Sequence, residues 1–409
     1  MSLDLLCSAP ADVFANKVWG HRAWLSRADD LPGEVADWFS VDAADELLSR
    51  RGLRTPFVRL AKGGRIVAPN RYTGSGGVGA TIGDQVMDDA VLRLFADGTT
   101  VVLQGVHRIW APVGRLAAGL SVDLGHPVQV NAYITPPQSQ GFASHYDTHD
   151  VFVLQVSGRK QWRVHDPVLD APMPEEPWDQ VADAVTARAA EPPVIEEMLE
   201  PGDCLYLPRG FLHSATALGG TSIHLTFGVH AVVERDVVDA VLAAVRDAGW
   251  RSSMPVGWDP TTESGVAEVG SLVAGVVDAL HALDPTAVAA MLHDERSARQ
   301  RPAPLSPLAQ ADNAAHLAAH HVVRLRDHLG ARVDHNPEAG ADQLVLNGRR
   351  RVAIEAGERP AVDALLTGDP LSVETLPLAD KAQAVALAQR LLREGVLVVH
   401  DAAASQSPQ

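Results

Sequence analysis

The sequence predicts an α+β protein in which a double-stranded β-helix, or jelly roll, precedes a helical region and a winged-helix-like module. Short apolar runs separated by Gly, Pro, Asn and Asp dominate residues 1–233, which is typical of two-sheet β domains. Amphipathic helical patterns begin at Glu234, and the proline-rich segment 301–307 introduces a region of mixed patterns. We therefore predict domains at 1–233, 234–306 and 307–400, with a disordered tail at 401–409.

The N-terminal part of the jelly-roll domain mixes helical and extended patterns. Helices are expected where apolar residues recur at helical spacing, and strands where apolar runs are bounded by turn residues. The expected elements are helices at 17–26, 42–53 and 111–125, a strand–turn–strand unit at 55–67 and a strand at 99–105. The run 74–79 matches a dinucleotide-binding motif formally, but no apolar strand precedes it, so we interpret it as a loop.

The strands that follow carry the candidate chemistry. His145 and Asp147 form an H-x-D triplet just before the apolar run 151–158, and residues two apart on an extended chain point to the same side. The run 204–208 lies between two Pro-Gly turns, so we expect a short strand with His213 beyond its far end. Further expected elements are a turn at Ser157 and Gly158, an insert helix at 181–190 and a strand at 222–229.

Two imidazoles and one carboxylate can occupy one face of an octahedral metal ion and leave three positions open. This arrangement is typical of non-haem Fe(II) oxygenases, in which the open positions take O2 and a co-substrate. We therefore predict that His145, Asp147 and His213 bind the metal and form the catalytic centre. His149 is a competing candidate, because the H-x-D-x-H run places three polar side chains on one face of an extended chain.

Residues 131–167, NAYITPPQSQGFASHYDTHDVFVLQVSGRKQWRVHDP, resemble the core of the JmjC-type ribosomal oxygenases, which are cupin-like protein hydroxylases dependent on Fe(II) and 2-oxoglutarate. The features shared, in the family's order, are Asn-Ala-Tyr, Thr-Pro-Pro, Gly-Phe before H-Y-D, and V-L-Q-x-x-G-x-K-x-W. The resemblance extends weakly over most of the chain. It implies a JmjC-type jelly roll with the same three ligands, and it makes His149 a supporting or structural histidine.

The resemblance also assigns the co-substrate site. It places Lys160 on the distal carboxylate of 2-oxoglutarate and puts Asn131, Tyr133 and His224 around the co-substrate. Lys160 is a sensible choice on physical grounds as well, because a buried carboxylate needs a cationic partner with hydrogen bonds. Some family members have a serine shortly after the S-x-H-x-T strand that helps to hold the co-substrate. The positions here are Phe227, Gly228 and Val229.

The resemblance implies an Fe(II)- and 2-oxoglutarate-dependent oxygenase that uses O2 to hydroxylate a side-chain carbon of a protein, with a ribosomal protein as the expected substrate. Other classes stay open. An oxygenase of this type could act on a natural-product peptide or a small molecule, or it could be a lysyl demethylase. A jelly roll without enzymatic activity could serve as a binding protein, in which case no succinate would be released.

Composition limits the partners and the compartment. The net charge of −17 disfavours binding to nucleic-acid phosphates and favours a basic partner, such as a segment of a ribosomal protein. Cys7 and Cys204 are the only cysteines of the sequence, so we expect no disulfide framework and a cytoplasmic location. The sequence contains no signal-peptide pattern and no apolar run of about 18 residues, so we expect no membrane partner.

The region after Glu234 predicts three amphipathic helices, at 234–250, 271–283 and 285–300. The resemblance implies that these helices form a homodimer, and a helical cap on the same domain is the alternative. Apolar residues recur at helical spacing along them. These residues are Val237, Val241, Val245, Leu272, Val276, Leu280, Val288 and Leu292.

The last region, 307–400, predicts strands and helices in a winged-helix-like order. Asn347-Gly348 between two apolar runs is a hairpin signal and marks the expected tip of the wing. We interpret the arginines at 349–351 as a solvated strand end and not as a DNA-binding surface. The resemblance assigns this module to architecture and partner contacts.

Overall fold

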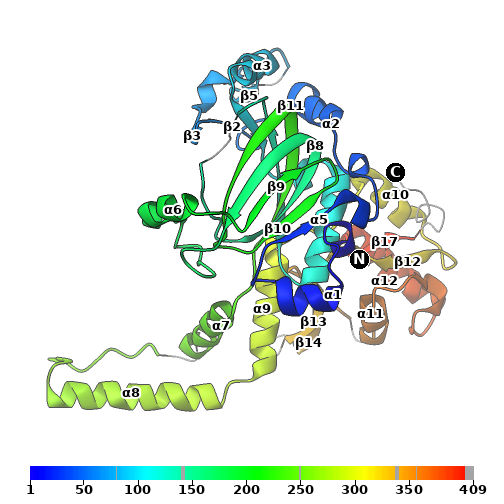
Figure 1. The fold of residues 1–409 in the computed structure, drawn as a ribbon. Helices are drawn as coiled ribbons and strands as arrows, with labels where there is room; N and C mark the ends of the chain where they lie inside the picture. The colour runs from blue at the N-terminus through cyan, green and yellow to red at the C-terminus, as the bar shows by residue number, and fades with distance from the viewer. Residues whose placement is uncertain (80, 140–142, 248–249, 337–339, 356, 401–409) are drawn as a thin grey trace. The chain divides into compact units, whose positions relative to one another are not determined.

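The computed structural model describes residues 1–409 except 80, 140–142, 248–249, 337–339, 356 and 401–409 (Figure 1). The chain divides into two compact units, Met1–Ala231 and Val232–Gln409, each of which has its own core. The predicted tail at 401–409 lies outside the described residues, as does the Gly-Phe pair at 141–142 of the family motif.

The first unit is the predicted jelly roll. In its described part, nine antiparallel strands follow the order β1-β10-β8-β11-β7-β6-β2-β3, with β9 beside β8. The strands are β1 Trp24–Ser26, β2 Val58–Lys62, β3 Arg65–Ile66, β6 Thr100–Leu103, β7 Val128–Thr135, β8 Asp150–His165, β9 Ile195–Leu199, β10 Cys204–Leu207 and β11 Leu212–Val229. A small pair, β4 Thr73–Gly74 and β5 Gln85–Val86, lies apart from them. The fold prediction for this unit is confirmed.

The two longest strands, β8 and β11, form the centre of this unit. The first half of β8 pairs with the second half of β11, and the second half of β8 pairs with the first half of β11. Phe152 and Leu154 face one apolar cluster, whereas Val151 and Val153 face another. Because the first half of β8 is buried on both faces, residues Val151–Leu154 form a continuous apolar run, whereas the second half of the strand contains polar residues.

Helices and short turns accompany the sheet in the first unit. The α-helices are α1 Ala11–Val13, α2 Val41–Arg50, α3 Asp88–Ala96, α4 Val106–Ile109, α5 Ala111–Leu124 and α6 Ala182–Ala189. Ser40 caps α2 by accepting a hydrogen bond from the backbone of Ala43 at 3.1 Å, and Gly125 ends α5 with a φ of 74°. The predicted helices at 42–53, 111–125 and 181–190 are therefore present with slightly shifted ends.

Two local predictions were wrong. Segment 17–26 is not a helix, because a helical turn ends at Val18 and Trp24–Ser26 pairs with β10 as an edge strand. Ser157 and Gly158 do not end a strand, since β8 runs through them to His165. In both cases, long-range strand pairing overrides the local turn and helix signals. The predicted strand at 204–208 is present as β10, and His213 lies beyond its far end in β11, which also contains the predicted strand 222–229.

The second unit contains helices followed by two small sheets. Its helices are α7 Glu234–Asp247, α8 Glu263–His281, α9 Pro285–Arg299, α10 Pro307–His316, α11 Arg359–Leu366 and α12 Lys381–Arg393. The sheets have the orders β16-β12-β17 and β13-β14-β15. Their strands are β12 Val322–Leu325, β13 Ala331–Asn336, β14 Ala341–Leu346, β15 Arg350–Ala353, β16 Leu371–Ser372 and β17 Leu397–Val399.

The predicted hairpin turn at Asn347 and Gly348 joins β14 to β15, and both residues have positive φ, 47° and 64°. The arginines at 349–351, which were expected at a solvated strand end, follow this turn. Arg350 forms an ion pair with Glu394, and Arg351 forms one with Asp334. Among the described helices, none alone has the length and hydropathy of a membrane span, and only α8 and α9 joined across an 85° bend meet those criteria.

A substitution at Gly158 tests the continuity of β8. Gly158 has a φ of +63°, and a Cβ there would lie 2.2 Å from the Thr221 carbonyl oxygen. Gly158→Ala should therefore lower the free energy of unfolding by at least about 2 kcal/mol in urea denaturation. Gly220→Ala is the matched control, since a Cβ there has no atom within 4 Å. Equal stability of the two variants would contradict the close approach of Gly158 to the Thr221 carbonyl.

Candidate metal centre

His145, Asp147 and His213 come together at the edge of the β8–β11 pair. His145 and His213 form an antiparallel bridge, in which His145 N donates to His213 O at 3.2 Å and His213 N donates to His145 O at 2.8 Å. One possible ligand atom from each of the three side chains lies within 4.8 Å of the others. His213 Nε2 lies 3.8 Å from Asp147 Oδ2. The structure thus brings together the three predicted ligands.

Both histidines are oriented in the same way. His145 Nδ1 is 2.8 Å from the Ala143 carbonyl, and His213 Nδ1 is 3.1 Å from the Phe211 carbonyl. Each carbonyl accepts a hydrogen bond only from a protonated Nδ1, so Nε2 is the ring nitrogen that each histidine can offer to a metal. Burial, and then the neighbouring His145, lowers the pKa of His213 to about 4. His213 is therefore neutral at pH 7, as a metal ligand must be.

His149 is not part of this group of three. Its ring packs at 66° to that of His230, with 5.1 Å between centroids, and its Nδ1 is buried without a hydrogen-bond partner. A Cβ on Gly228 would lie 3.1 Å from His149 Cε1 and 3.3 Å from Gln129 Cγ. A side chain at position 228 would therefore press on the His149 ring, which gives a physical reason for the glycine found there.

A cavity of about 240 Å³ opens beside the three ligands. Its walls come from the jelly-roll strands and from the segment after β8. The lining residues are Arg59, Thr100, Tyr133, Thr135, His145, Asp147, Val151, Val153, Lys160, Trp162, Trp178, His213, Ser214, Ala215, His224 and Thr226. Asp147, one of the candidate ligands, is the only carboxylate in this lining.

Lys160 is a buried cation in the wall of this cavity, with 3% of its surface exposed. Its Nζ donates to Thr135 Oγ1 at 3.0 Å and lies 3.0 Å from His224 Nδ1. Within the described part of the chain, no carboxylate forms an ion pair with Lys160, and burial lowers the pKa of Lys160 to about 7. An ammonium group in such a place lacks the anion that normally accompanies a buried charge.

His224 and Tyr133 form a stacked pair next to Lys160. Their strands pair residue for residue at this point, and the two rings lie 4.9 Å apart at 7°. Burial, and then the charge of Lys160, lowers the pKa of His224, so this ring is neutral and can accept the lysine's hydrogen bond. Burial raises the pKa of Tyr133 to about 12, which keeps its hydroxyl protonated.

Asn131 lies on β7, two residues before Tyr133. Its Oδ1 accepts a hydrogen bond from Gly105 N at 3.0 Å, and Asn131 is not among the residues that line the cavity. A side-chain hydrogen bond with Asn131 acts on the Tyr133 hydroxyl. Asn131 therefore fixes the loop before α4 and acts on the cavity through Tyr133.

Several lining residues were not singled out in the sequence, and three of them bear on the chemistry of the cavity. Arg59 on β2 has a buried Nε without a hydrogen-bond partner. Thr135 accepts from Lys160, and Trp178 lies with its ring centroid 6.4 Å from that of His145. A period-two pattern on β2 identifies the face that carries Arg59, but only the strand order β2-β6-β7 places that face beside Tyr133.

Several known proteins are similar to parts of this chain. Residues 115–237 match the JmjC domain family. Ribosomal oxygenase 1 of Homo sapiens is 31% identical over 231 residues, which cover 55% of this chain and 34% of that protein. The bifunctional lysine-specific demethylase and histidyl-hydroxylase NO66 of Aedes aegypti is 44% identical over 105 residues, 24% of this chain and 15% of that protein. The chain thus spans about a third or less of the length of these relatives.

A solved structure covers more of the chain. YcfD, a ribosomal oxygenase from Escherichia coli in complex with cobalt and 2-oxoglutarate, aligns with 97% of this chain and 99% of its own, with a TM-score of 0.56 and 19% identity. At 19% identity, this likeness concerns the fold alone.

Removal of a ligand tests the metal centre. His145→Ala and Asp147→Ala should abolish high-affinity Co²⁺ binding, measured by titration calorimetry on metal-free protein, because two donors cannot hold a facial site. Thermal unfolding should change little, since Val151 and Val153 are packed by apolar neighbours. His149→Ala is the matched control and should bind Co²⁺ with at most about a 10–100-fold loss. Wild-type affinity in the His145 and Asp147 variants would refute the ligand assignment.

Proposed function

We infer that this chain, of which residues 115–237 match the JmjC domain, is an Fe(II)- and 2-oxoglutarate-dependent protein hydroxylase related to the ribosomal oxygenases. The observation that carries this proposal is the pairing of two features in one cavity. Three facial metal ligands line one part of it, and the buried Lys160, without a carboxylate partner among the described residues, lines another. A metal-chelating dicarboxylate satisfies both requirements.

The donor set fits Fe(II). Two neutral imidazoles and one carboxylate leave open positions for the 1-carboxylate and keto oxygens of 2-oxoglutarate and for O2. When bound, iron with these co-substrates supplies the oxidising power needed to hydroxylate an unactivated carbon. The protein supplies the binding site. Lys160 holds the distal carboxylate, and Thr135 and Tyr133 offer hydroxyl donors beside it.

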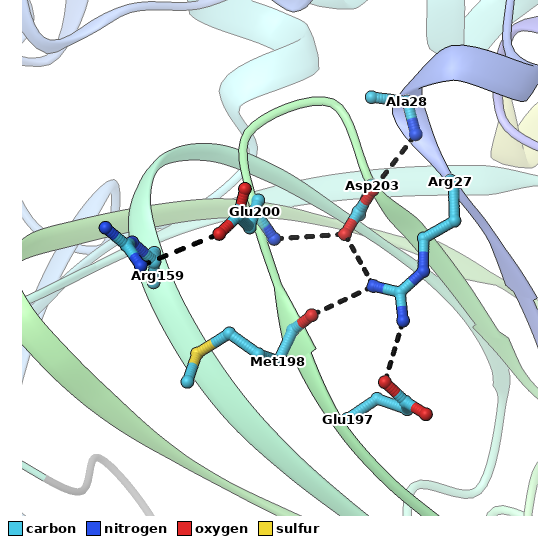
Figure 2. Close-up of polar contacts among 7 residues, drawn as sticks. All are labelled: Arg27, Ala28, Arg159, Glu197, Met198, Glu200 and Asp203. Atoms are coloured by element: carbon cyan, nitrogen blue, oxygen red, sulfur yellow. Dashed lines mark hydrogen bonds and ion pairs between the residues drawn. The ribbon is translucent and has the colours of Figure 1, made fainter.

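Substitution of Lys160 tests co-substrate binding. Lys160→Ala should raise the KM for 2-oxoglutarate by more than about 100-fold and leave Co²⁺ affinity unchanged, because loss of one partner of a buried ion pair costs roughly 3–5 kcal/mol. The neighbouring Arg159 is exposed and lies 3.6 Å from Glu200 (Figure 2), so Arg159→Ala is the matched control. A rise of less than about threefold for Lys160→Ala would show that another group binds the carboxylate.

The same lysine predicts a pH dependence for wild-type protein. Lys160 holds a carboxylate only when protonated, and its pKa in the free protein is about 7. The affinity for 2-oxoglutarate should therefore be constant below this pH and fall about tenfold per pH unit above it.

We propose that the substrate is a protein, and a ribosomal protein is the first candidate. The net charge of −17 suits a basic partner, and the relatives in humans and Escherichia coli are named ribosomal oxygenases. Mass spectrometry of ribosomal proteins from a deletion strain and its parent tests this proposal. A peptide heavier by about one oxygen atom in the parent supports it. Unchanged ribosomal proteins would point to a natural-product peptide or a small molecule.

Lysyl demethylation is the second candidate, because the NO66 relatives carry that activity in their name. Demethylation of an N-methyl group and hydroxylation of a carbon share the same metal centre and differ in substrate. Methylated lysine peptides would lose mass under demethylation, whereas a hydroxylated peptide gains it.

The expected cytoplasmic location accords with Cys7 and Cys204, which are both buried as free thiols.

We also propose that the chain forms a homodimer through α7 and α8. Two of the valines expected at the interface, Val245 and Val288, are instead buried within the second unit. Other apolar side chains of these helices are exposed, which is unusual for a monomer. The exposed residues are Val237, Val238, Leu242, Val266, Val269, Leu272, Val273, Val277 and Leu280.

Light scattering at micromolar concentration tests the dimer. A two-fold dimer should give a mass near twice the 43.5 kDa of the chain, and a mass near 43.5 kDa would refute it. Val273→Glu, at a position that is 57% exposed on α8, should shift the mass toward the monomer. Leu92→Glu places the same charge at an exposed leucine of α3 and should leave the dimer intact.

A further inference from the structure

The turn between β10 and β11 delivers His213, and it is tied to the segment that carries the other two ligands. Two hydrogen bonds join the backbones of His145 and His213. Gly210 N donates to the Asp147 carbonyl at 3.0 Å. Arg209 N donates to the carboxylate of Asp150, Oδ1, at 3.2 Å. Segments 145–150 and 209–213 therefore run side by side. Hydrogen bonds join them at both ends and in the middle.

Asp150 is the one side chain among these contacts. The other hydrogen bonds join backbone atoms, so no simple substitution removes them. Asp150 is 1% exposed and does not line the cavity. Its Oδ1 also accepts from the Tyr206 hydroxyl at 3.1 Å, and that hydroxyl accepts from Gly20 N at 2.9 Å. One carboxylate thus holds the turn after β10 and the strand itself.

The second carboxylate oxygen of Asp150 forms an ion pair with Arg209. Oδ2 is buried without a hydrogen-bond partner, and Arg209 Nη1 lies 3.7 Å from it. Arg209 Nε is buried without a partner as well. A buried ion pair with unfilled hydrogen-bonding capacity contributes little to net stability, and an apolar pair of the same volume would often serve stability as well. The charges of Asp150 and Arg209 are better explained by a role in fixing the spacing of the two segments.

We propose that Asp150 is a positioning residue that couples the two ligand-bearing segments and sets the separation between Asp147 and His213. It acts through the Arg209 backbone and guanidinium and touches neither metal nor co-substrate. This inference rests on the proposed function, because it gives Asp150 a role only if the three ligands hold a metal. Asp150 should therefore affect metal affinity more than it affects the stability of the fold.

Asp203 provides a matched comparison at the other end of β10. Its carboxylate is also buried, with 4% of the residue exposed. It accepts from Arg27 Nη1 at 2.9 Å, Ala28 N at 2.9 Å and Glu200 N at 3.0 Å (Figure 2). These bonds tie the turn before β10 to the segment after β1. The Asp203 side chain has the same chemistry as that of Asp150 and no contact with either ligand segment.

The experiment compares Co²⁺ binding to metal-free wild type, Asp150→Ala and Asp203→Ala, together with thermal unfolding. We expect Asp150→Ala to bind Co²⁺ about 10–100-fold more weakly, the range typical of groups that orient metal ligands. Its Co²⁺ absorption spectrum should change as well, because the ligand spacing changes. Asp203→Ala should lower the melting temperature to a similar degree and bind Co²⁺ within about threefold of wild type.

Asp150→Asn keeps the proposal testable if Asp150→Ala does not fold. It retains an oxygen for the Tyr206 hydroxyl and Arg209 N but removes the charge opposite Arg209, so an intermediate loss of Co²⁺ affinity is expected. Wild-type affinity in both Asp150 variants would overturn the proposal, as would an equal loss in Asp203→Ala. Absence of Co²⁺ binding to wild type would instead overturn the proposed function.

Discussion

The candidate site depends on one antiparallel bridge between two segments that are far apart in the sequence. His145 and His213 exchange both backbone hydrogen bonds, and this fixes their side chains on one side of the pair. Asp147 follows two residues later on the same extended segment. Without the bridge, the two halves of the ligand set belong to separate loops. The jelly roll makes the bridge possible, because β8 and β11 are paired at both ends and bring the two segments together.

The opposite part of the cavity depends on a buried charge without a counterion. Lys160 is desolvated, and Thr135 and His224 satisfy its hydrogen bonds without neutralising it. Both neighbours are themselves buried and neutral. Such a site favours an anion over a neutral ligand of the same shape, because only an anion offsets the desolvation of the ammonium group. The proposed metal ligands and Lys160 are thus suited to bind the two ends of one dicarboxylate.

Local patterns predicted the chemistry of this chain better than its strand boundaries. The H-x-D triplet and the downstream histidine predicted the three residues that the structure brings together, and the short apolar runs between turn residues predicted the jelly roll. Ser157 and Gly158 resemble a turn, yet the strand continues through them, because Gly158 packs against the Thr221 carbonyl of β11. Arg59 could not be predicted from its surroundings in the sequence, since its place at the cavity follows from the pairing of β2, β6 and β7.

Thr135 supplies a hydroxyl group to the cavity beside Lys160. A hydroxyl group has one donor and two acceptor sites. Thr135 Oγ1 accepts from Lys160 Nζ at 3.0 Å, and Thr100 Oγ1 approaches it as a second donor at 3.5 Å. With both acceptor sites directed to these neighbours, the Thr135 proton points elsewhere, and Thr135 lines the cavity. A carboxylate held by Lys160 would therefore meet a hydroxyl donor from β7. The glycine at 228, near the place of the serine that this chain lacks, leaves room for the ring of His149.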